Sequence, residues 1–319
     1  MNQSTPPESD KELPASGMSR RQALRCMGWA GAGVLWTMAG GVACSSLIGS
    51  HRSGSAAGGF SFAQISDSHI GFNKEPNHDP SATLQSAIDQ IRALPQRPSL
   101  LIHTGDVSQL SRSDQFDTAE QIIKGAGLDT FYVPGEHDVL VDDGSEFFQR
   151  FAKGSGGKGW YSFDQGGVHF VALVNVLNLR PGGFGYLGPE QLAWLEQDLR
   201  GRSASTPLVI FTHMPLWTLY PAWGWGTDDG AQAMALLRRF GSVTVLSGHI
   251  HQVIQKVEGQ VSFHTAASTA FPQPPAGVGA GPGPMKVPAN QLRQLLGIRT
   301  VNYVPGREVL AVIDTPLMG

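Results

Sequence analysis

Cysteine is almost absent from this 319-residue chain. The only two, Cys26 and Cys44, lie near the N-terminus, so the rest of the chain has no thiol for a disulfide, a zinc-thiolate site or a cysteine nucleophile. Any metal ion in that part must therefore be bound by histidine and carboxylate side chains. Such ligands suit manganese, iron or zinc better than metals that require soft ligands.

An excess of positive charge is lacking as well. The formal net charge is −3, and the first 59 residues contain five basic and three acidic side chains. Subtracting them from 23 basic and 26 acidic residues leaves 18 and 23, a net charge of −5. We therefore expect no nucleic-acid-binding surface. The hydrophobic content of 41% is typical of a globular domain and not of a disordered chain.

The N-terminal segment, residues 1–44, has the pattern of an export signal. A polar start is followed by Arg20-Arg21 and then by a Gly/Ala-rich apolar stretch over 27–43. This resembles a twin-arginine signal, which implies export machinery as a partner and a periplasmic or other extracytoplasmic location. A general secretory signal and an uncleaved anchor are the alternatives, although the glycines weaken the stretch as a membrane span.

Cys44 follows Val42-Ala43 at the end of this segment and resembles the acceptor cysteine of a lipoprotein. A lipid there would anchor the protein to the membrane, and cleavage without a lipid is the other possibility. Residues 45–59 are rich in serine and glycine, which predicts a flexible linker. The folded domain is therefore expected over 60–319.

From Phe60 onward, short apolar runs alternate with amphipathic segments, which predicts an α/β fold. Strands are expected over 60–65, 100–103, 130–133, 160–163, 168–174, 208–212 and 243–246, and helices near 81–94, 113–124, 189–199 and 231–240. Four further strand-like runs, 253–257, 260–265, 299–303 and 309–314, predict a second, largely antiparallel block. Residues 272–288 are rich in glycine and proline, which predicts an irregular surface loop.

Ionisable side chains follow the ends of several predicted strands. They are Asp67, His69, Asp106, Glu136, His137, Asp138, His213, His249 and His251. Strand carboxyl ends meet at one edge of an α/β sheet, so these groups should converge. Carboxylates that converge in this way cannot all stay ionised without nearby positive charge, which favours a site with two cations.

In order, Asp67-Ser68-His69, Gly105-Asp106, Gly135-Glu136-His137-Asp138, His213 and Gly248-His249-Ile250-His251 resemble the signature of calcineurin-like metallophosphoesterases. Residues 187–195 are similar to a helix of the branch that contains class III cyclic-nucleotide phosphodiesterases. The resemblance extends from about residue 60 to about residue 265. It implies a four-layer α/β/β/α sandwich of two mixed sheets.

The resemblance also implies two metal ions, which could be manganese, iron or zinc. Asp67, His69, Asp106 and His251 would hold one ion, while Asp106, Glu136, His213 and His249 would hold the other. His137 would protonate the leaving oxygen, with Asp138 orienting its ring. The expected function is an exported phosphoric-ester hydrolase, a phosphodiesterase or phosphomonoesterase that uses a metal-bridging hydroxide; the alternative is a non-enzymatic, metal-stabilised binding module.

Glu136 departs from the family pattern, which normally has asparagine at this position. A carboxylate adds one negative charge and a longer reach. It either binds the second metal or swings away and leaves the position to water.

The other histidines have less specific expectations. His103, His169 and His264 lie within apolar runs and are expected to be packing residues, while His78 follows the first motif and faces either solvent or substrate. The aromatic segment 217–225 follows His213 and forms either a loop over the metals or a self-packed cap.

Overall fold

The structure, a computed structural model, describes residues 59–152, 155–306 and 310–318. The predicted export signal and nearly all of the predicted linker lie outside these ranges and stay predictions. Within them, no helix has both the length and the apolar character needed to cross a membrane.

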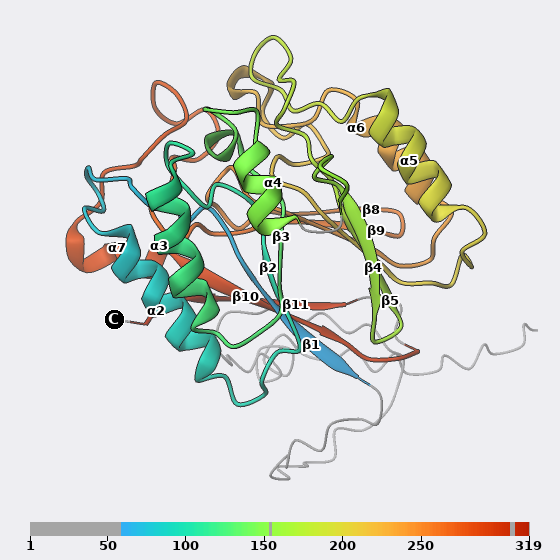
Figure 1. Cartoon of the computed structure of the whole chain (residues 1–319), viewed down its shortest axis with the longest axis horizontal. Helices are drawn as coiled ribbons and strands as arrows, with labels where there is room; N and C mark the ends of the chain where they lie inside the picture. Colours follow the sequence, from blue (N-terminus) through green and yellow to red (C-terminus); the bar gives the residue numbers. More distant parts are fainter. Residues whose placement is uncertain (1–58, 153–154, 307–309, 319) are drawn as a thin grey trace, which may run out of the picture. The chain divides into compact units, whose positions relative to one another are not determined.

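The described chain contains eleven strands, and helices separate most of them except within the runs β4–β5, β7–β8–β9 and β10–β11 (Figure 1). The strands are β1 (Phe60–Ile65), β2 (Leu101–His103), β3 (Thr130–Tyr132), β4 (Tyr161–Gln165), β5 (Val168–Ala172), β6 (Leu208–Phe211), β7 (Val243–Ser247), β8 (Gln255–Glu258), β9 (Val261–Thr265), β10 (Gly297–Tyr303) and β11 (Ala311–Pro316). The helices are α2 (Pro80–Arg92), α3 (Ser113–Lys124), α4 (Ser145–Phe151), α5 (Pro189–Leu199), α6 (Gly230–Leu237) and α7 (Ala289–Leu295), with short 3-10 turns at Glu136–Asp138 and Pro221–Trp223.

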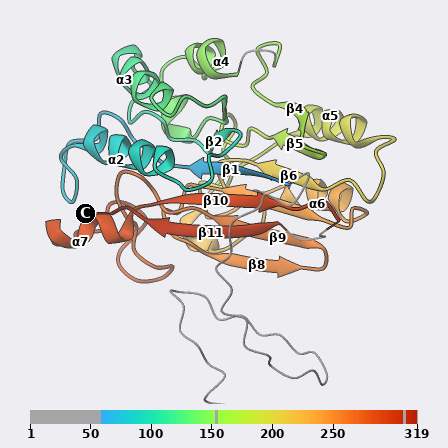
Figure 2. The same ribbon diagram turned by 90° about the horizontal axis from the view of Figure 1, so that it is seen from below.

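The strands form two mixed sheets. The first has the order β11-β10-β1-β2-β3 and the second the order β4-β5-β6-β7-β9-β8. In the first sheet β1, β2 and β3 are parallel, and in the second β5, β6, β7 and β9 are parallel. Figure 2 shows the strands of both sheets together in the body of the domain, between α2 on one side and α5 on the other. The parallel strands of each sheet therefore end at a common edge.

Three apolar clusters divide the domain into four layers. Alternate residues of one strand enter different clusters: Leu101 packs under α2 and α3, while Ile102 packs between the sheets. In β6, likewise, Ile210 packs under α5 and α6 and Val209 faces the other sheet. This alternation follows from the two-residue period of a strand with both faces buried. The predicted α/β/β/α sandwich is confirmed.

The four C-terminal strands pair largely antiparallel, as predicted, but the prediction that they form a second block of their own is wrong. β8 and β9 form an antiparallel hairpin, but β9 then pairs in parallel with β7. β10 and β11 join the other sheet, where β10 lies antiparallel to β1. The two hairpins are local, but the strand that each one meets is distant in sequence, so periodicity does not reveal it.

Two short helices were not predicted. α4 contains Phe147, Phe148 and Phe151, all buried, so its apolar residues are too crowded to show an amphipathic period. α7 has seven residues and only Leu292 buried. The segment 272–288 contains no helix or strand, as predicted.

A buried arginine connects the two sheets. Arg299 of β10 is 1% exposed, and its guanidinium donates to Asp314 at 2.8 Å in the same sheet. It also donates to Gln64 at 3.1 Å and to the Thr265 carbonyl at 2.7 Å, at the end of β9 in the other sheet. The buried guanidinium therefore forms hydrogen bonds with three acceptors, which come from both sheets.

Arg299→Met should lower the free energy of unfolding by about 3 kcal/mol, because it leaves the Asp314 carboxylate, Gln64 and a buried carbonyl without their donor. Urea unfolding followed by circular dichroism measures the change. The matched control is Arg92→Ala, which removes an exposed ion pair with Asp89 and should cost less than about 1 kcal/mol. Equal effects of the two substitutions would contradict the role assigned to Arg299.

Candidate metal centre

All seven predicted metal ligands meet at the common edge where the parallel strands end. They form two groups of potential ligand atoms, each within 4.8 Å of one another: Asp67, His69, Asp106 and His251 in the first group, and Glu136, His213 and His249 in the second. Asp67, His69 and Asp106 follow β1 and β2 in one sheet, whereas His213 and His251 follow β6 and β7 in the other. The first group has the four members that the family resemblance implied, and the second has three of its four, without Asp106; a third group of Asp106, Glu136 and His137 overlaps both.

The backbone at five of these residues is left-handed. The φ angles are 53° at Asp67, 41° at His69, 53° at Asp106, 68° at His249 and 53° at His251. This conformation costs a non-glycine residue about 1–2 kcal/mol. Backbone hydrogen bonds between the loops hold it, including 2.9 Å from the Asp67 nitrogen to the Gly105 carbonyl and 2.8 Å from the His69 nitrogen to the Asp106 carbonyl.

Glycines that precede ligands let these loops approach closely. A Cβ atom at Gly248 would stand 2.7 Å from Oδ2 of Asp67, and one at Gly135 would stand 2.5 Å from the Asp106 nitrogen. Side chains at either position would push the ligand loops apart. The close packing of the ligand loops therefore explains why glycine occupies positions 135 and 248.

Asp106 lies between the two groups. Its Oδ2 is 3.4 Å from Nε2 of His69 in the first group and 3.4 Å from Nε2 of His213 in the second. Its other oxygen accepts a hydrogen bond of 3.0 Å from the His137 backbone nitrogen, which fixes the carboxylate plane. This is the position required of a ligand shared by two cations.

Glu136 points into the second group. Its Oε2 is 2.9 Å from Nε2 of His213, and its Oε1 is 3.0 Å from Nδ1 of His249. Of the two orientations expected from the sequence, the structure has the inward one. The extra methylene relative to asparagine is accommodated at the start of the 3-10 turn Glu136–Asp138.

The potential metal-ligand atoms are arranged to bind a cation, and several of them form no hydrogen bond with one another. Asp67 Oδ2, Glu136 Oε2, His213 Nε2 and His249 Nδ1 are buried without a hydrogen-bond partner, even though short distances separate some of them. Such a concentration of unpaired polar atoms is unfavourable in a folded protein. Nitrogen and carboxylate donors in this arrangement suit borderline metals such as manganese, iron and zinc.

Backbone carbonyls orient two of the histidines. Nδ1 of His213 donates to the Thr104 carbonyl at 2.7 Å, and Nδ1 of His251 donates to the Phe271 carbonyl at 2.6 Å. In both rings the Nε2 lone pair is therefore directed to the ligand group. Sequence reasoning did not identify Thr104 and Phe271, and it could not have, because a carbonyl acceptor leaves no signal in residue type.

The charges of the cluster shift its pKa values in opposite directions. Burial opposes ionisation of Glu136, yet His249 and His213 hold its pKa well below the usual range. Burial also disfavours charge on His213, but Asp106 and Glu136 raise its pKa well above the usual value. Burial and the neighbouring His251 and His137 lower the pKa of His69 to about 3, although Asp106 opposes them. The carboxylates thus draw positive charge into the cluster.

His137 lies between the two groups, with a ring nitrogen within 4.8 Å of a carboxylate oxygen of both Asp106 and Glu136. Its ring packs edge-on against His69 with centroids 4.9 Å apart, and its Nδ1 donates to the Gln109 carbonyl at 2.8 Å. Burial lowers its pKa, but the charges of Asp106 and Glu136 outweigh burial, so the net pKa is raised. Its Nε2 remains available for a substrate.

The expectation that Asp138 orients the His137 ring is wrong. Asp138 Oδ1 accepts from the Ser108 nitrogen at 2.7 Å and from the Ser108 hydroxyl at 2.8 Å. Its Oδ2 accepts from the nitrogens of Val107 and Gly135, each at 3.0 Å. Asp138 therefore ties together the loops that carry Asp106 and Glu136, while the Gln109 carbonyl orients the ring.

The remaining histidines lie away from the ligand groups or behind them. His103 is buried, and its Nε2 forms a hydrogen bond of 2.8 Å with the Ser68 hydroxyl. It therefore helps to hold the loop that carries Asp67 and His69. His169 is buried between Asp164 and Asp198, at 2.8 and 2.7 Å. His264 is largely buried, and His78 is exposed beside Asn73. His103, His169 and His264 are buried, as expected, and His78 is exposed to solvent, which is one of its two expected positions.

The aromatic segment 217–225 is self-packed. Trp225 is fully buried, Trp223 lies edge-on to it at 5.0 Å, and Tyr220 lies edge-on to Trp223 at 5.2 Å. Trp217 packs on Phe263 at 4.9 Å. Of the two expectations for this segment, the self-packed cap is the one observed.

Known proteins share both the sequence pattern and the fold. The chain is 25% identical to a 3′,5′-cyclic-nucleotide phosphodiesterase of Nostoc sp. over 217 residues, which cover 66% of this chain and 79% of that protein. It is also 25% identical to the glycerophosphodiester phosphodiesterase GpdQ of Enterobacter lignolyticus, over 66% and 78% of the two chains. A dimetal phosphatase from Danio rerio superposes with a TM-score of 0.59 at 16% identity, over 81% of this chain and 99% of that one.

The solved structure supports the fold alone, because its sequence identity is low. The family assignment rests on a direct match: residues 60–253 match the family described as calcineurin-like phosphoesterase. That range begins at β1 and includes every residue of the two ligand groups. The chain therefore belongs to the calcineurin-like phosphoesterase family of metal-dependent hydrolases.

Proposed function

We propose that this protein is an exported two-metal phosphodiesterase. The observation that carries the hydrolytic part is the position of Asp106, whose Oδ2 lies at 3.4 Å from a histidine of each ligand group, with His137 held beside them. Two groups that share one carboxylate match the geometry needed for in-line displacement at phosphorus.

Bound at this centre, two cations would supply an activated water and offset the charge of the phosphate. The protein side chains position the groups around that reaction. Asp106 joins the two ligand groups, and the Gln109 carbonyl holds the Nδ1 proton of His137. When His137 is doubly protonated, its Nε2 carries the proton that it donates to the leaving oxygen.

The charge of Glu136 favours diesters over monoesters. A phosphodiester carries one negative charge, whereas a monoester carries close to two near neutral pH. A carboxylate in place of a neutral amide therefore repels the monoester more strongly. The names of the phosphodiesterases to which the chain is similar support the same preference.

The test is hydrolysis by the metal-loaded protein of bis(p-nitrophenyl) phosphate and p-nitrophenyl phosphate. We expect turnover of both, a higher kcat/KM for the diester, and loss of turnover after chelation. Protein that contains two metals per chain but hydrolyses neither compound would instead be the non-enzymatic binding module considered above.

Glu136→Asn should raise the ratio of monoester to diester kcat/KM about tenfold. The neutral amide removes one charge close to the phosphate, and a tenfold change corresponds to about 1.4 kcal/mol, within the range for a partly screened charge pair. The measurement compares the two p-nitrophenyl substrates at saturating metal. Asp114→Asn, at an exposed carboxylate of α3, is the control and should leave the ratio unchanged. A ratio that falls in Glu136→Asn would contradict the charge argument.

His137→Ala should lower kcat about 100-fold for a diester with an alkyl leaving group, because the leaving alkoxide then lacks a proton donor. The loss should be much smaller for p-nitrophenolate, which leaves without protonation. Metal content should not change, because His137 is proposed as the acid and not as a ligand; a loss of metal would show that it binds one of the ions, which its place beside Asp106 and Glu136 allows. An equal loss for both leaving groups would show that His137 does not act as the acid.

Export is supported by the sequence of residues 1–44, which lie outside the described ranges. Changing both Arg20 and Arg21 to lysine should leave the full chain in the cytoplasm as an unprocessed precursor, as judged by fractionation and immunoblotting. Arg25→Lys is the matched control and should not affect export. Unchanged export of the double variant would count against a twin-arginine signal.

A further inference from the structure

Phe271 is a buried aromatic residue that packs against two members of the first ligand group. Its ring centroid lies 4.7 Å from that of His69, with the planes inclined by 31°, and 4.7 Å from that of His251, with the planes inclined by 47°. Phe271 is only 4% exposed. A single phenyl ring therefore covers part of both imidazoles and keeps solvent from it.

The two imidazoles differ in how their Nδ1 atoms are bound. Nδ1 of His251 donates to the Phe271 carbonyl at 2.6 Å, so a hydrogen bond fixes the orientation of that ring. Nδ1 of His69 is buried and has no hydrogen-bond partner among the described residues. Histidine ligands of metals usually donate this proton to a carbonyl or a carboxylate, and that bond sets the ring orientation. In His69, packing takes the place of the hydrogen bond.

Two aromatic neighbours hold the His69 ring. His137 lies edge-on to it, with centroids 4.9 Å apart and planes at 78°, and Phe271 lies against it at the smaller angle. Edge-to-face and tilted arrangements of this kind are favourable between rings. Nε2 of His69 lies 3.4 Å from Oδ2 of Asp106 and 3.2 Å from Nε2 of His251. The packing therefore directs Nε2 toward the other atoms of the first group.

Neighbours of Phe271 along the chain bond to the loops that carry ligands. The Ser268 hydroxyl donates to the Asp67 carbonyl at 2.7 Å and accepts from the Phe271 nitrogen at 3.1 Å. The Gln273 amide donates to the His249 carbonyl at 2.9 Å. Phe271 is thus fixed on both sides. These residues lie beyond the range that matches the family.

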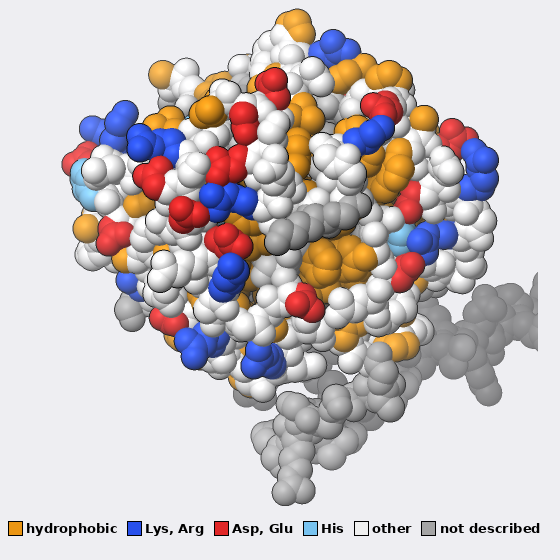
Figure 3. Space-filling model, in the orientation of Figure 1, with side chains coloured by type: hydrophobic (Ala, Val, Ile, Leu, Met, Phe, Trp, Pro, Cys, Tyr) orange, Lys and Arg blue, Asp and Glu red, His pale blue; other side chains and the backbone are white. Residues whose placement is uncertain are grey.

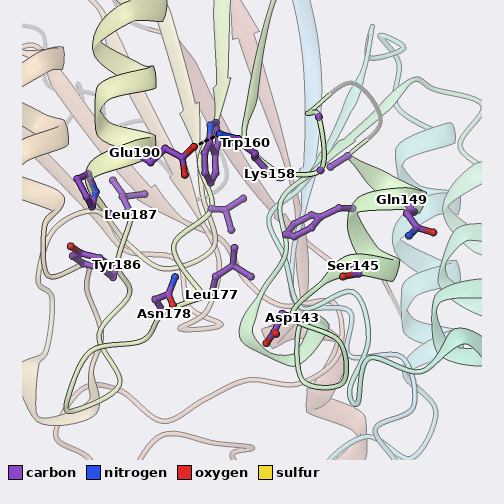
Figure 4. Close-up of a pocket in the computed structure, with 17 residues that line it drawn as sticks. Asp143, Ser145, Gln149, Lys158, Trp160, Leu177, Asn178, Tyr186, Leu187 and Glu190 are labelled. Carbon is purple, nitrogen blue, oxygen red and sulfur yellow. Dashed lines mark hydrogen bonds and ion pairs between the residues drawn. The ribbon is translucent and has the colours of Figure 1, made fainter.

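The other surroundings of Phe271 are purely apolar. It forms a small cluster with Phe72 and Ala270, in which the centroids of the two phenyl rings are 4.4 Å apart. Among the described aromatic rings, Phe72 pairs with Phe271 alone. Phe271 does not line the cavity of about 880 Å³ between α4 and the segment that leads into α5 (Figure 4). Phe72 is therefore a buried phenyl of the same cluster that does not stack on a ligand.

We infer that Phe271 is a positioning residue for the first metal ion and acts through two separate groups. Its ring holds the imidazole of His69, and its carbonyl holds the imidazole of His251. The inference rests on the proposed function in that it requires a cation at the first ligand group. Removal of the ring should weaken the binding of that cation.

The test measures Mn²⁺ binding at the first group alone. A Glu136→Ala background removes a carboxylate from the second group, so one ion should bind per chain. In this full-length background, Phe271→Leu keeps the backbone carbonyl and an apolar side chain but removes the ring. Its Kd for Mn²⁺, measured by isothermal titration calorimetry, should rise at least tenfold, as is usual when a group that orients a ligand is lost.

Phe72→Leu in the same background is the matched control, because it makes the same change in the same cluster. It should leave the Kd within twofold, although circular dichroism of the metal-free proteins should show a similar loss of thermal stability in both variants. The visible spectrum of bound Co²⁺, which depends on ligand geometry, should change only in Phe271→Leu. On the face in Figure 3, acidic side chains lie among basic ones, so this surface should bind few additional cations.

An unchanged Kd in Phe271→Leu, or an equal rise in both leucine variants, would overturn the inference and leave the phosphodiesterase intact. If Phe271→Leu does not fold, Phe271→Met replaces it; failure of both to fold would assign Phe271 to the core alone and also overturn the inference. If the Glu136→Ala background binds no ion, the same comparison is made in the wild-type chain. A wild type that binds no Mn²⁺ and hydrolyses no diester would overturn the proposed function as well.

Discussion

Three carboxylates in a largely buried cluster stay ionised only if positive charge lies beside them, and this requirement organises the domain. Asp67, Asp106 and Glu136 are each surrounded by histidines at about hydrogen-bonding distance or slightly beyond. In the protein alone, His213 responds with a raised pKa, and several donor atoms stay unpaired. A cation meets both needs at once, because it neutralises the carboxylates and accepts the unpaired lone pairs.

Much of the free-energy cost of forming this cluster comes from the backbone conformation of the ligand loops. Five ligands have left-handed φ angles, and loops approach so closely that two glycines cannot bear side chains. Hydrogen bonds between loops, the four donors to Asp138 and the carbonyl acceptors of His213 and His251 hold this arrangement. Strain of this kind persists where the surrounding structure determines the conformation, as two regular sheets do here.

Much of the fold and the candidate site could be predicted from the sequence because both depend on local patterns. Buried strands are apolar runs, and the ligands follow the ends of those runs, so Asp67 and His213 could be placed at one edge of the sheets before their contacts were known. The role of Asp138 could not be predicted, because it depends on which nitrogens of other loops face it. The pairing of β9 with β7, and of β10 with β1, likewise depends on contacts between distant segments.

Each ligand group takes side chains from both sheets. The first combines Asp67 and Asp106 with His251, and the second combines Glu136 with His213 and His249. A cation bound to either group would therefore cross-link the halves of the sandwich, as a disulfide does in other proteins. In a domain that contains no cysteine, the same ions that support hydrolysis would also slow unfolding, so resistance to proteolysis would depend on the metal supply of the compartment in which the protein works.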